Sequence, residues 1–272
     1  MGCLIHPTAI IAPGAELGEN VSIGPYCVIA DKVRIGDGCV FEPFVRLLDY
    51  VEIGRECHLH ENSVLGGTPQ DHDFTGGVSW VRLGNRVICR EAVTIHRGSG
   101  EGTETAVGDD CMLMEGVHLG HNVRLGRHCI LTNKVGLSGY VEVGDNTVIG
   151  GMVGFHQFVK IGRLCMVGGL SKVIKDVPPF CMADGHPIKI YGLNKVGLRR
   201  NGFGQEERTH IKRIYRTLFM NRMTKQEAME RVVEMYPEDP IAAEILAFVR
   251  SVKRGLAPWA GVDNMKEGLR ND

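Results

Sequence analysis

Apolar residues recur at every sixth position along the first two thirds of the chain. Counting from Ile5, every such site through Leu65 is apolar, and the register resumes at Leu83 and continues, with one further break, to Val173. A small or β-branched residue often follows four positions later, as at Val21. A helix with about 3.6 residues per turn would rotate such a stripe around its axis. The strict period of six therefore predicts short strands joined by turns and stacked in parallel.

Glycine often follows the apolar site directly, as at Gly18, Gly36 and Gly126. Corners between short strands need a permissive backbone, so we expect these glycines to form the corners. The pattern resembles the hexapeptide-repeat family, whose coils of three hexapeptides form a triangular prism. This resemblance, and not the period, implies an all-β left-handed parallel β-helix over about residues 5–180, because left-handed crossovers are otherwise rare.

Two breaks interrupt the repeat, and both are whole multiples of six residues long. They predict inserted loops near residues 66–82 and 98–105 of a β-helix domain spanning 1–185. Loops that leave a rigid scaffold often carry ligand contacts, and the first contains Gln70 and Asp71.

The period ends after Pro178 and Pro179, and the remainder predicts a small helical domain over 186–272. We expect helices over 204–221, over 225–235 after a Thr224 to Glu227 capping box, and over 240–254 opened by Pro240.

Composition narrows the possible functions. The 272 residues carry a net charge of −1, which gives no general attraction to nucleic acid. The sequence shows neither a signal peptide nor an apolar stretch long enough to span a membrane, so we expect a cytoplasmic protein without stable membrane insertion. Six of the nine cysteines occupy the second inward position of the repeat, where a compact buried side chain is expected.

Two histidines lie outside the inward positions, in the segment from Val117 to His121. Without further evidence, an exposed histidine on a β-helix is usually just solvated. Residues 18 apart are neighbours in adjacent coils, so His121 is predicted to lie beside Gly139, whose N–H could face an oxyanion next to a base.

Several motifs recur in an order that is similar to one transferase family. They are PQD at 69–71, TIHRG at 94–98, HLGH at 118–121, HQF at 156–158, DVPP at 176–179 and GLRRNGF at 197–203. Together they resemble the UDP-N-acetylglucosamine 3-O-acyltransferases of lipid A biosynthesis over nearly the whole chain. The resemblance implies a homotrimer with active sites between subunits.

The resemblance also implies a reaction and its residues. An (R)-3-hydroxyacyl chain passes from acyl carrier protein to the UDP-sugar, without metal, other cofactor or covalent acyl-enzyme. His121 would be the general base, as suits an imidazole, and Gly139 N–H would hold the oxyanion. The resemblance implies that Gly169 limits acyl length and that Arg200 lies near the phosphates. The matched binding positions for the sugar, the acyl chain and the nucleotide are Gln70, Asp71, His118, His156, Gln157, Gly169, Asn194 and Arg200.

Four positions depart from the family pattern. Asp73 replaces a usual lysine, Asn122 an aspartate, Tyr140 a histidine and Val196 a glutamate. The reversed charge at Asp73 could favour an amino group on the acceptor, so the 3-amino analogue of the sugar stays an alternative.

Three other functions remain open alternatives. The chain could be another hexapeptide transferase, such as one that uses acetyl-coenzyme A. A zinc enzyme of this fold would need three imidazoles, and the sequence offers no third partner for His118 and His121. A non-enzymatic prism would leave the motif set unexplained.

Overall fold

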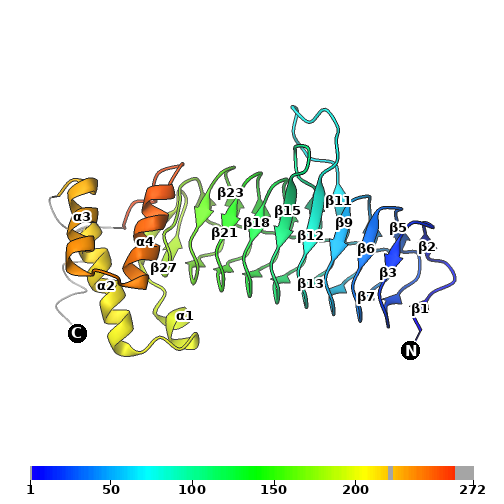
Figure 1. The fold of residues 1–272 in the computed structure, drawn as a ribbon, viewed down its shortest axis with the longest axis horizontal. Helices are drawn as coiled ribbons and strands as arrows, with labels where there is room; N and C mark the ends of the chain where they lie inside the picture. The colour runs from blue at the N-terminus through cyan, green and yellow to red at the C-terminus, as the bar shows by residue number, and fades with distance from the viewer. Residues whose placement is uncertain (1, 220–222, 261–272) are drawn as a thin grey trace.

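The computed structural model describes residues 2–219 and 223–260, which form a long prism with helices gathered at its C-terminal end (Figure 1). Strands of two to five residues stack in three sheets that run the length of the prism, and all strand pairs except one at the C-terminal end are parallel. The predicted parallel β-helix is confirmed, since each coil contributes one strand to each sheet.

The strands are grouped here by sheet, in the order in which they stack. Sheet A consists of β1 (Leu4–Ile5), β4 (Ser22–Ile23), β7 (Val40–Phe41), β10 (His58–Leu59), β13 (Ile88–Cys89), β16 (Met112–Leu113), β19 (Ile130–Leu131), β22 (Val148–Ile149), β25 (Met166–Val167), β27 (Cys181–Asp184) and β28 (Lys189–Leu193). Sheet B consists of β2 (Ile10–Ile11), β5 (Val28–Ile29), β8 (Arg46–Leu47), β11 (Val64–Gly67), β14 (Thr94–His96), β17 (His118–Leu119), β20 (Gly136–Leu137), β23 (Gly154–Phe155) and β26 (Lys172–Val173). Sheet C consists of β3 (Glu16–Leu17), β6 (Val33–Ile35), β9 (Val51–Ile53), β12 (Trp80–Leu83), β15 (Glu104–Val107), β18 (Arg124–Leu125), β21 (Glu142–Val143) and β24 (Lys160–Ile161).

The register between coils shows where the two insertions lie. Most neighbouring strands pair at a spacing of 18 residues, as Leu4 does with Ser22. The spacing widens to 30 between His58 and Ile88, and to 24 between Ile88 and Met112. Both extra lengths leave the prism as loops beside β11, β12 and β15, as predicted (Figure 1).

The apolar repeat fills the interior of the prism. Leu65, Leu119 and Leu137 are fully buried, and so are the second inward positions such as Val117 and Cys27. All nine cysteines are free, and burial raises the pKa of the Cys89 thiol to about 12. Structural packing is thus the role that the fold gives the buried cysteines.

The glycines that follow the apolar sites serve a purpose other than the one expected. At most corners the left-handed backbone falls two residues later, usually on a non-glycine residue such as Asn20, Tyr140 or Phe158. Gly36 instead lies against the next coil, where a Cβ atom would be 2.7 Å from the carbonyl carbon of Gly54. Close contact between coils, and not backbone freedom, therefore selects glycine there.

We expect Gly36→Ala to destabilise the fold by about 1–3 kcal/mol, because the added methyl group would force adjacent coils apart. Gly136→Ala is the matched control, since a Cβ atom at Gly136 meets no atom within 4 Å. Thermal unfolding of both variants checks this. Equal melting temperatures would show that the glycine serves only the corner.

The outer face of sheet C carries a ladder of alternating charge. Arg34 lies 3.2 Å from both Glu16 and Glu52, and Arg82 lies 2.8 Å from both Glu52 and Glu104. The ladder continues through Arg124, Glu142 and Lys160. Such compensated charge is typical of a surface that faces solvent.

The end of the prism departs from the sequence prediction. After β26 the chain forms a hairpin in which β28 pairs antiparallel with β27. The expected domain boundary after residue 185 falls in the turn of this hairpin, so β28 belongs to sheet A and not to the helical part. The hairpin was missed because it does not follow the six-residue period.

The described residues after the hairpin form four helices: α1 (Lys195–Arg200), α2 (Gln205–Phe219), α3 (Lys225–Met235) and α4 (Pro240–Ser251). The Thr224 to Glu227 capping box and the proline at the start of α4 are as predicted. The short helix α1 was not expected. Within the predicted helical region, residues 220–222 and 261–272 lie outside the described residues.

Asp176 anchors the segment after α4 to the prism. Its buried carboxylate accepts hydrogen bonds from the backbone N–H groups of Lys160, Lys253 and Arg254, at 2.8–3.3 Å. Because three donors surround this buried charge, the aspartate of the DVPP motif has a structural role.

Candidate active site

A groove of about 720 Å³ runs along the outer face of sheet B, beside its corner with sheet C. Five predicted site residues line it together with Gly139: Gln70, His118, His121, His156 and Gln157. The strands β17, β20 and β23 and their corner residues thus bring together positions that lie 18 and 36 residues apart in sequence.

His121 lies at the corner after β17 and is 9% exposed. Its Nδ1 atom is 3.0 Å from Oδ1 of Asn122, and the same oxygen accepts the backbone N–H of Ser99 at 2.8 Å. Asn122 in turn donates its backbone N–H to the hydroxyl of the buried Thr105, at 2.8 Å. The imidazole is therefore held from its Nδ1 side.

These contacts also assign the protonation of the neutral ring. A backbone N–H can only donate, so the Asn122 atom that faces Ser99 must be the amide oxygen. The same oxygen then accepts from Nδ1–H of His121, which leaves the lone pair on Nε2. Nε2 is thus the atom of His121 that can take a proton from a substrate.

Asp71 faces this free nitrogen from the first inserted loop. Its Oδ2 atom is 4.0 Å from Nε2 of His121 and accepts a short hydrogen bond from the Ser99 hydroxyl, while Oδ1 accepts the N–H of Asp73 at 3.1 Å. The Ser99 hydroxyl first, and then the Asp73 N–H, lower the pKa of Asp71 below its usual range. The carboxylate therefore stays ionised at neutral pH beside the base.

Gly139 lies one coil above His121, as the 18-residue spacing predicts. Tyr140 donates its N–H to the carbonyl of His121 at 3.0 Å, and a Cβ atom on Gly139 would overlap the His121 ring, 2.5 Å from Cε1. Among the hydrogen bonds of the described residues, none uses the Gly139 N–H as donor. This group therefore stays our prediction for an oxyanion donor.

Tyr140, one of the departures from the family pattern, packs against the base. Its ring meets that of His121 edge to face at 5.2 Å and stacks on Phe158 at 4.8 Å. Both aromatic residues occupy the left-handed corner position of successive coils. The pair therefore packs beside the His121 ring from the coils that follow it, and neither residue is among those that line the groove.

His118 lies on β17 at the edge of the groove floor. Its Nδ1 atom is 2.8 Å from the Thr94 hydroxyl, and its ring contacts that of His96 edge to face. Burial, and then the neighbouring His96, lower the pKa of His118, which keeps the ring neutral. Gly136 and Gly154 continue the same row with open space where a side chain would be. They leave a shallow trough beside His118.

Three predicted site residues lie away from this groove. Gly169 is on the corner between sheets A and B, where a Cβ atom would lie 3.2 Å from the carbonyl of Gly151. Asn194 is 9% exposed, and its side chain caps α1 at Gly197 N and donates to the carbonyl of Leu164. Arg200 is exposed at the end of α1. A single subunit does not bring these three residues to His121.

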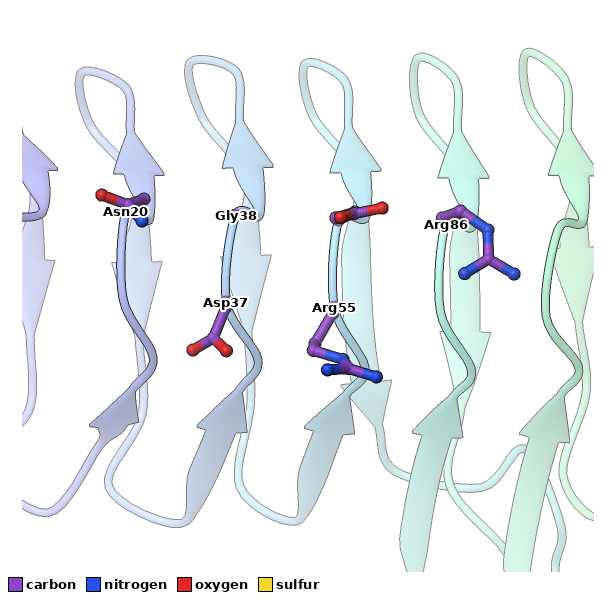
Figure 2. A pocket seen from close by; sticks show the side chains of 6 residues that line it. Asn20, Asp37, Gly38, Arg55 and Arg86 are labelled. Atoms are coloured by element: carbon purple, nitrogen blue, oxygen red, sulfur yellow. The ribbon is translucent and has the colours of Figure 1, made fainter. Parts of the chain in front are cut away.

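A second hollow, of about 390 Å³, lies on the corner between sheets C and A. Figure 2 shows that its residues, including Asn20, Asp37, Arg55 and Arg86, come from successive coils and are spread along the corner. Asp37 accepts the N–H of Glu19 at 2.8 Å, and Arg86 pairs with Asp110 at 2.6 Å. Structural contacts thus occupy these charges, and none of the predicted site residues lies there.

One group of possible metal ligands occurs among the described residues, namely His60, Glu61 and Glu91. Arg90 pairs with Glu91 at 2.7 Å, so a cation already occupies that carboxylate. The group contains neither His118 nor His121, and the zinc alternative gains no third ligand from it.

Sequence reasoning missed Ser99, Thr105 and Lys172. Ser99 and Thr105 belong to the second inserted segment and contact the partner of His121, while Lys172 lines the groove. Thr105 carried a signal, because it is a hydroxyl residue at an inward position of the repeat. Ser99 carried none, because loop contacts do not follow the period.

This fold and groove define a hexapeptide-repeat acyltransferase, and comparison with known proteins supports that class. A family model described as bacterial transferase hexapeptide (six repeats) matches residues 1–31 and 32–67. A second, described as UDP-N-acetylglucosamine O-acyltransferase, domain 2, matches residues 176–257.

Two curated relatives span nearly the whole chain. The acyl-(acyl-carrier-protein)–UDP-N-acetylglucosamine O-acyltransferase of Chlorobaculum parvum is 57% identical over 92% of this chain and 96% of its own length. The enzyme of the same name from a Sulfurihydrogenibium species is 54% identical over 94% and 95%. The crystal structure of the Francisella novicida UDP-N-acetylglucosamine acyltransferase superposes with a TM-score of 0.91, at 32% identity over 96% of both chains.

The chain therefore belongs to the UDP-N-acetylglucosamine O-acyltransferase family and is an acyltransferase with the expected left-handed β-helix. Within residues 2–219 and 223–260, no helix is both long and apolar enough to cross a membrane.

Proposed function

We propose that the protein transfers an (R)-3-hydroxyacyl chain from acyl carrier protein to the 3-position of UDP-N-acetylglucosamine, a step of lipid A biosynthesis, in the cytoplasm. The observation that carries the proposal is the contact of His121 Nδ1 with Asn122, which leaves Nε2 free beside a groove lined by four other matched residues: Gln70, His118, His156 and Gln157. The two relatives are named for the same donor and acceptor.

His121 acts as the general base in the proposed mechanism. Its Nε2 atom accepts the proton of the sugar 3-hydroxyl while the oxygen attacks the thioester carbonyl carbon. Gly139 N–H donates to the resulting oxyanion. When the intermediate collapses, the carbon–sulfur bond breaks, and the thiol of the carrier leaves with the proton from His121. These steps require neither a metal nor a further cofactor.

Asp71 and Asp73 bear on the choice of acceptor. Both carboxylates lie in the first inserted loop, and Asp73 donates its N–H to Asp71. A second negative charge beside the sugar-binding carboxylate favours a cationic group, which makes the 3-amino analogue of the sugar the alternative acceptor.

Product analysis tests the assignment. We expect mass spectrometry to detect a 3-hydroxyacylated nucleotide sugar when the pure protein receives 3-hydroxyacyl carrier protein thioesters and UDP-N-acetylglucosamine. A parallel reaction with the 3-amino analogue decides the acceptor. Consumption of acetyl-coenzyme A alone would contradict the proposal.

We also propose that the protein works as a homotrimer with each site between two subunits. His121 lies on the corner between sheets B and C, whereas Gly169 lies on the corner between sheets A and B, and Arg200 lies beyond the last coil. A substrate that reaches all three residues would have to span two chains. The charged ladder leaves sheet C for solvent and sheets A and B for contact between subunits.

Co-expression of His121→Ala and Arg200→Ala subunits tests this arrangement. Each variant alone should be impaired, whereas mixed trimers should regain activity. One of the three sites in each mixed trimer, or roughly a quarter of all sites at equal expression, combines an unaltered His121 from one chain with an unaltered Arg200 from the other. Light scattering should report three subunits. Absence of any recovery in purified mixed trimers would contradict a shared site.

A further inference from the structure

Ser99 contacts both groups that surround the base, and nothing in the family pattern gives it a role. Its backbone N–H donates to Oδ1 of Asn122 at 2.8 Å, and its hydroxyl donates to Oδ2 of Asp71. Asn122 holds Nδ1 of His121, while Asp71 faces Nε2. One residue of the second loop thus contacts the groups on both sides of the imidazole.

Ser99 is itself held by contacts between the two inserted loops. Gly98 and Gly102, on either side of it, donate their N–H groups to the carbonyls of Trp80 and Val78, at 3.4 and 2.8 Å. Val78 donates its own N–H to the carboxylate of Glu101 at 2.9 Å. Because both loops contribute, the position of Ser99 depends on their mutual contacts and not on the prism alone.

We propose that Ser99 is a positioning residue of the acyltransferase site, which fixes the orientation of the Asn122 amide through its N–H and the Asp71 carboxylate through its hydroxyl. The proposal rests on the proposed function and extends it. The backbone N–H of Ser99 makes the Asn122 oxygen, and not its NH₂ group, face His121. This orientation sets which ring nitrogen of His121 is free. The Ser99 hydroxyl holds Asp71 where the acceptor sugar is expected to bind.

Because residue 122 is an asparagine with a neutral amide, its orientation depends on the contact with the Ser99 N–H. An aspartate at position 122 would present an acceptor oxygen in either orientation, whereas an asparagine presents an acceptor in only one of two orientations. If the amide were reversed, its NH₂ group would face both the Ser99 N–H and Nδ1–H of His121. The Ser99 N–H therefore excludes the orientation that would change the tautomer of the base.

Steady-state kinetics of Ser99→Ala test the hydroxyl contact. We expect the KM for the nucleotide sugar to rise about tenfold, because Asp71 loses a charge-assisted hydrogen bond, while kcat falls less. Ser99→Thr should restore the KM. Thr103→Val is the matched control, because it removes a hydroxyl of the same loop whose one hydrogen bond within residues 2–219 and 223–260 is to the carbonyl of Gly100.

A double-mutant cycle separates positioning from general loosening of the loop. If the hydroxyl acts through Asp71, then Ser99→Ala should add less than twofold to the effect of Asp71→Asn. Additive effects, an unchanged KM in Ser99→Ala, or an equal rise in Thr103→Val would each overturn the proposal. Thermal unfolding of each variant shows whether it is folded.

Nitrogen NMR of His121 tests the backbone contact without depending on turnover. We expect the neutral ring to carry its proton on Nδ1 in the unaltered protein. In Asn122→Asp, which keeps an acceptor in either orientation, the proton should stay on Nδ1. A proton on Nε2 would overturn the proposal, whereas a correct tautomer without acyl transfer would contradict only the proposed function.

Discussion

Replacing His121 by alanine should lower kcat/KM for acyl transfer by about 10²–10⁴-fold, the usual contribution of a positioned base. The reason lies in the contacts of its ring. Nδ1 is committed to Asn122, and the free Nε2 lies 4.0 Å from Asp71 at the edge of the groove. In the described part of the chain, no other imidazole has both a fixed tautomer and this position.

The matched control for this variant is His128→Ala. His128 also follows a corner of the prism, but its side chain is 56% exposed and lies 3.8 Å from Asp110, on the corner between sheets C and A. Its loss should leave kcat/KM within about twofold, since surface substitutions rarely matter. Substantial turnover by folded His121→Ala trimers would remove histidine as the base.

Gly139→Ala should lower kcat/KM by about 10²-fold or more, although it adds only one methyl group. The new Cβ atom would overlap Nε2 of His121 and lie 2.5 Å from Cε1, so the imidazole would have to leave its position. A displacement of about 1 Å in a reacting group is enough for such a loss. The backbone of Gly139 is not in the left-handed region, so alanine causes no backbone strain of its own.

Gly204→Ala provides the comparison for this second variant. A Cβ atom there lies 3.5 Å from a flexible carboxylate oxygen of Glu207, far from the groove. Both variants should remain folded, and only Gly139→Ala should lose activity. If Gly139→Ala kept full activity, the close stacking of His121 beneath this glycine would have no catalytic importance.

The prism was predictable from the sequence because every inward position needs an apolar or small side chain that fills the interior, and these positions recur every six residues. The apolar stripe through Leu65, Leu119 and Val173 defines the register, and the spacing of 18 residues between coils is enough to place Gly139 against His121. The lengths of the two breaks also locate the loops. The six-residue period predicts the register, the coil spacing and the loop positions because neighbouring coils impose the same packing on one another.

Other features depend on contacts that no period encodes. The hydrogen bond from Ser99 to Asp71 joins two loops of different coils. The strand β28 runs antiparallel to β27 and so breaks the parallel pattern, and α1 is too short for an amphipathic pattern. The reason for Gly36 was also misread, since only the structure shows the next coil against it. Asn194 has a visible structural role, and its predicted part in binding stays a prediction for the trimer.

The ladder on sheet C also constrains how the length of the prism can change. Successive coils place Glu16, Arg34, Glu52 and Arg82 in direct register, so the sign reverses with each step. Deleting one coil of 18 residues would bring like charges opposite each other, whereas deleting two adjacent coils would preserve the alternation. Along these four coils, the protein can therefore gain or lose coils in pairs more readily than singly, and the same rule opposes a slip of one coil during folding. The rule ends at the next coil, where the uncharged Ala106 lies opposite Arg82.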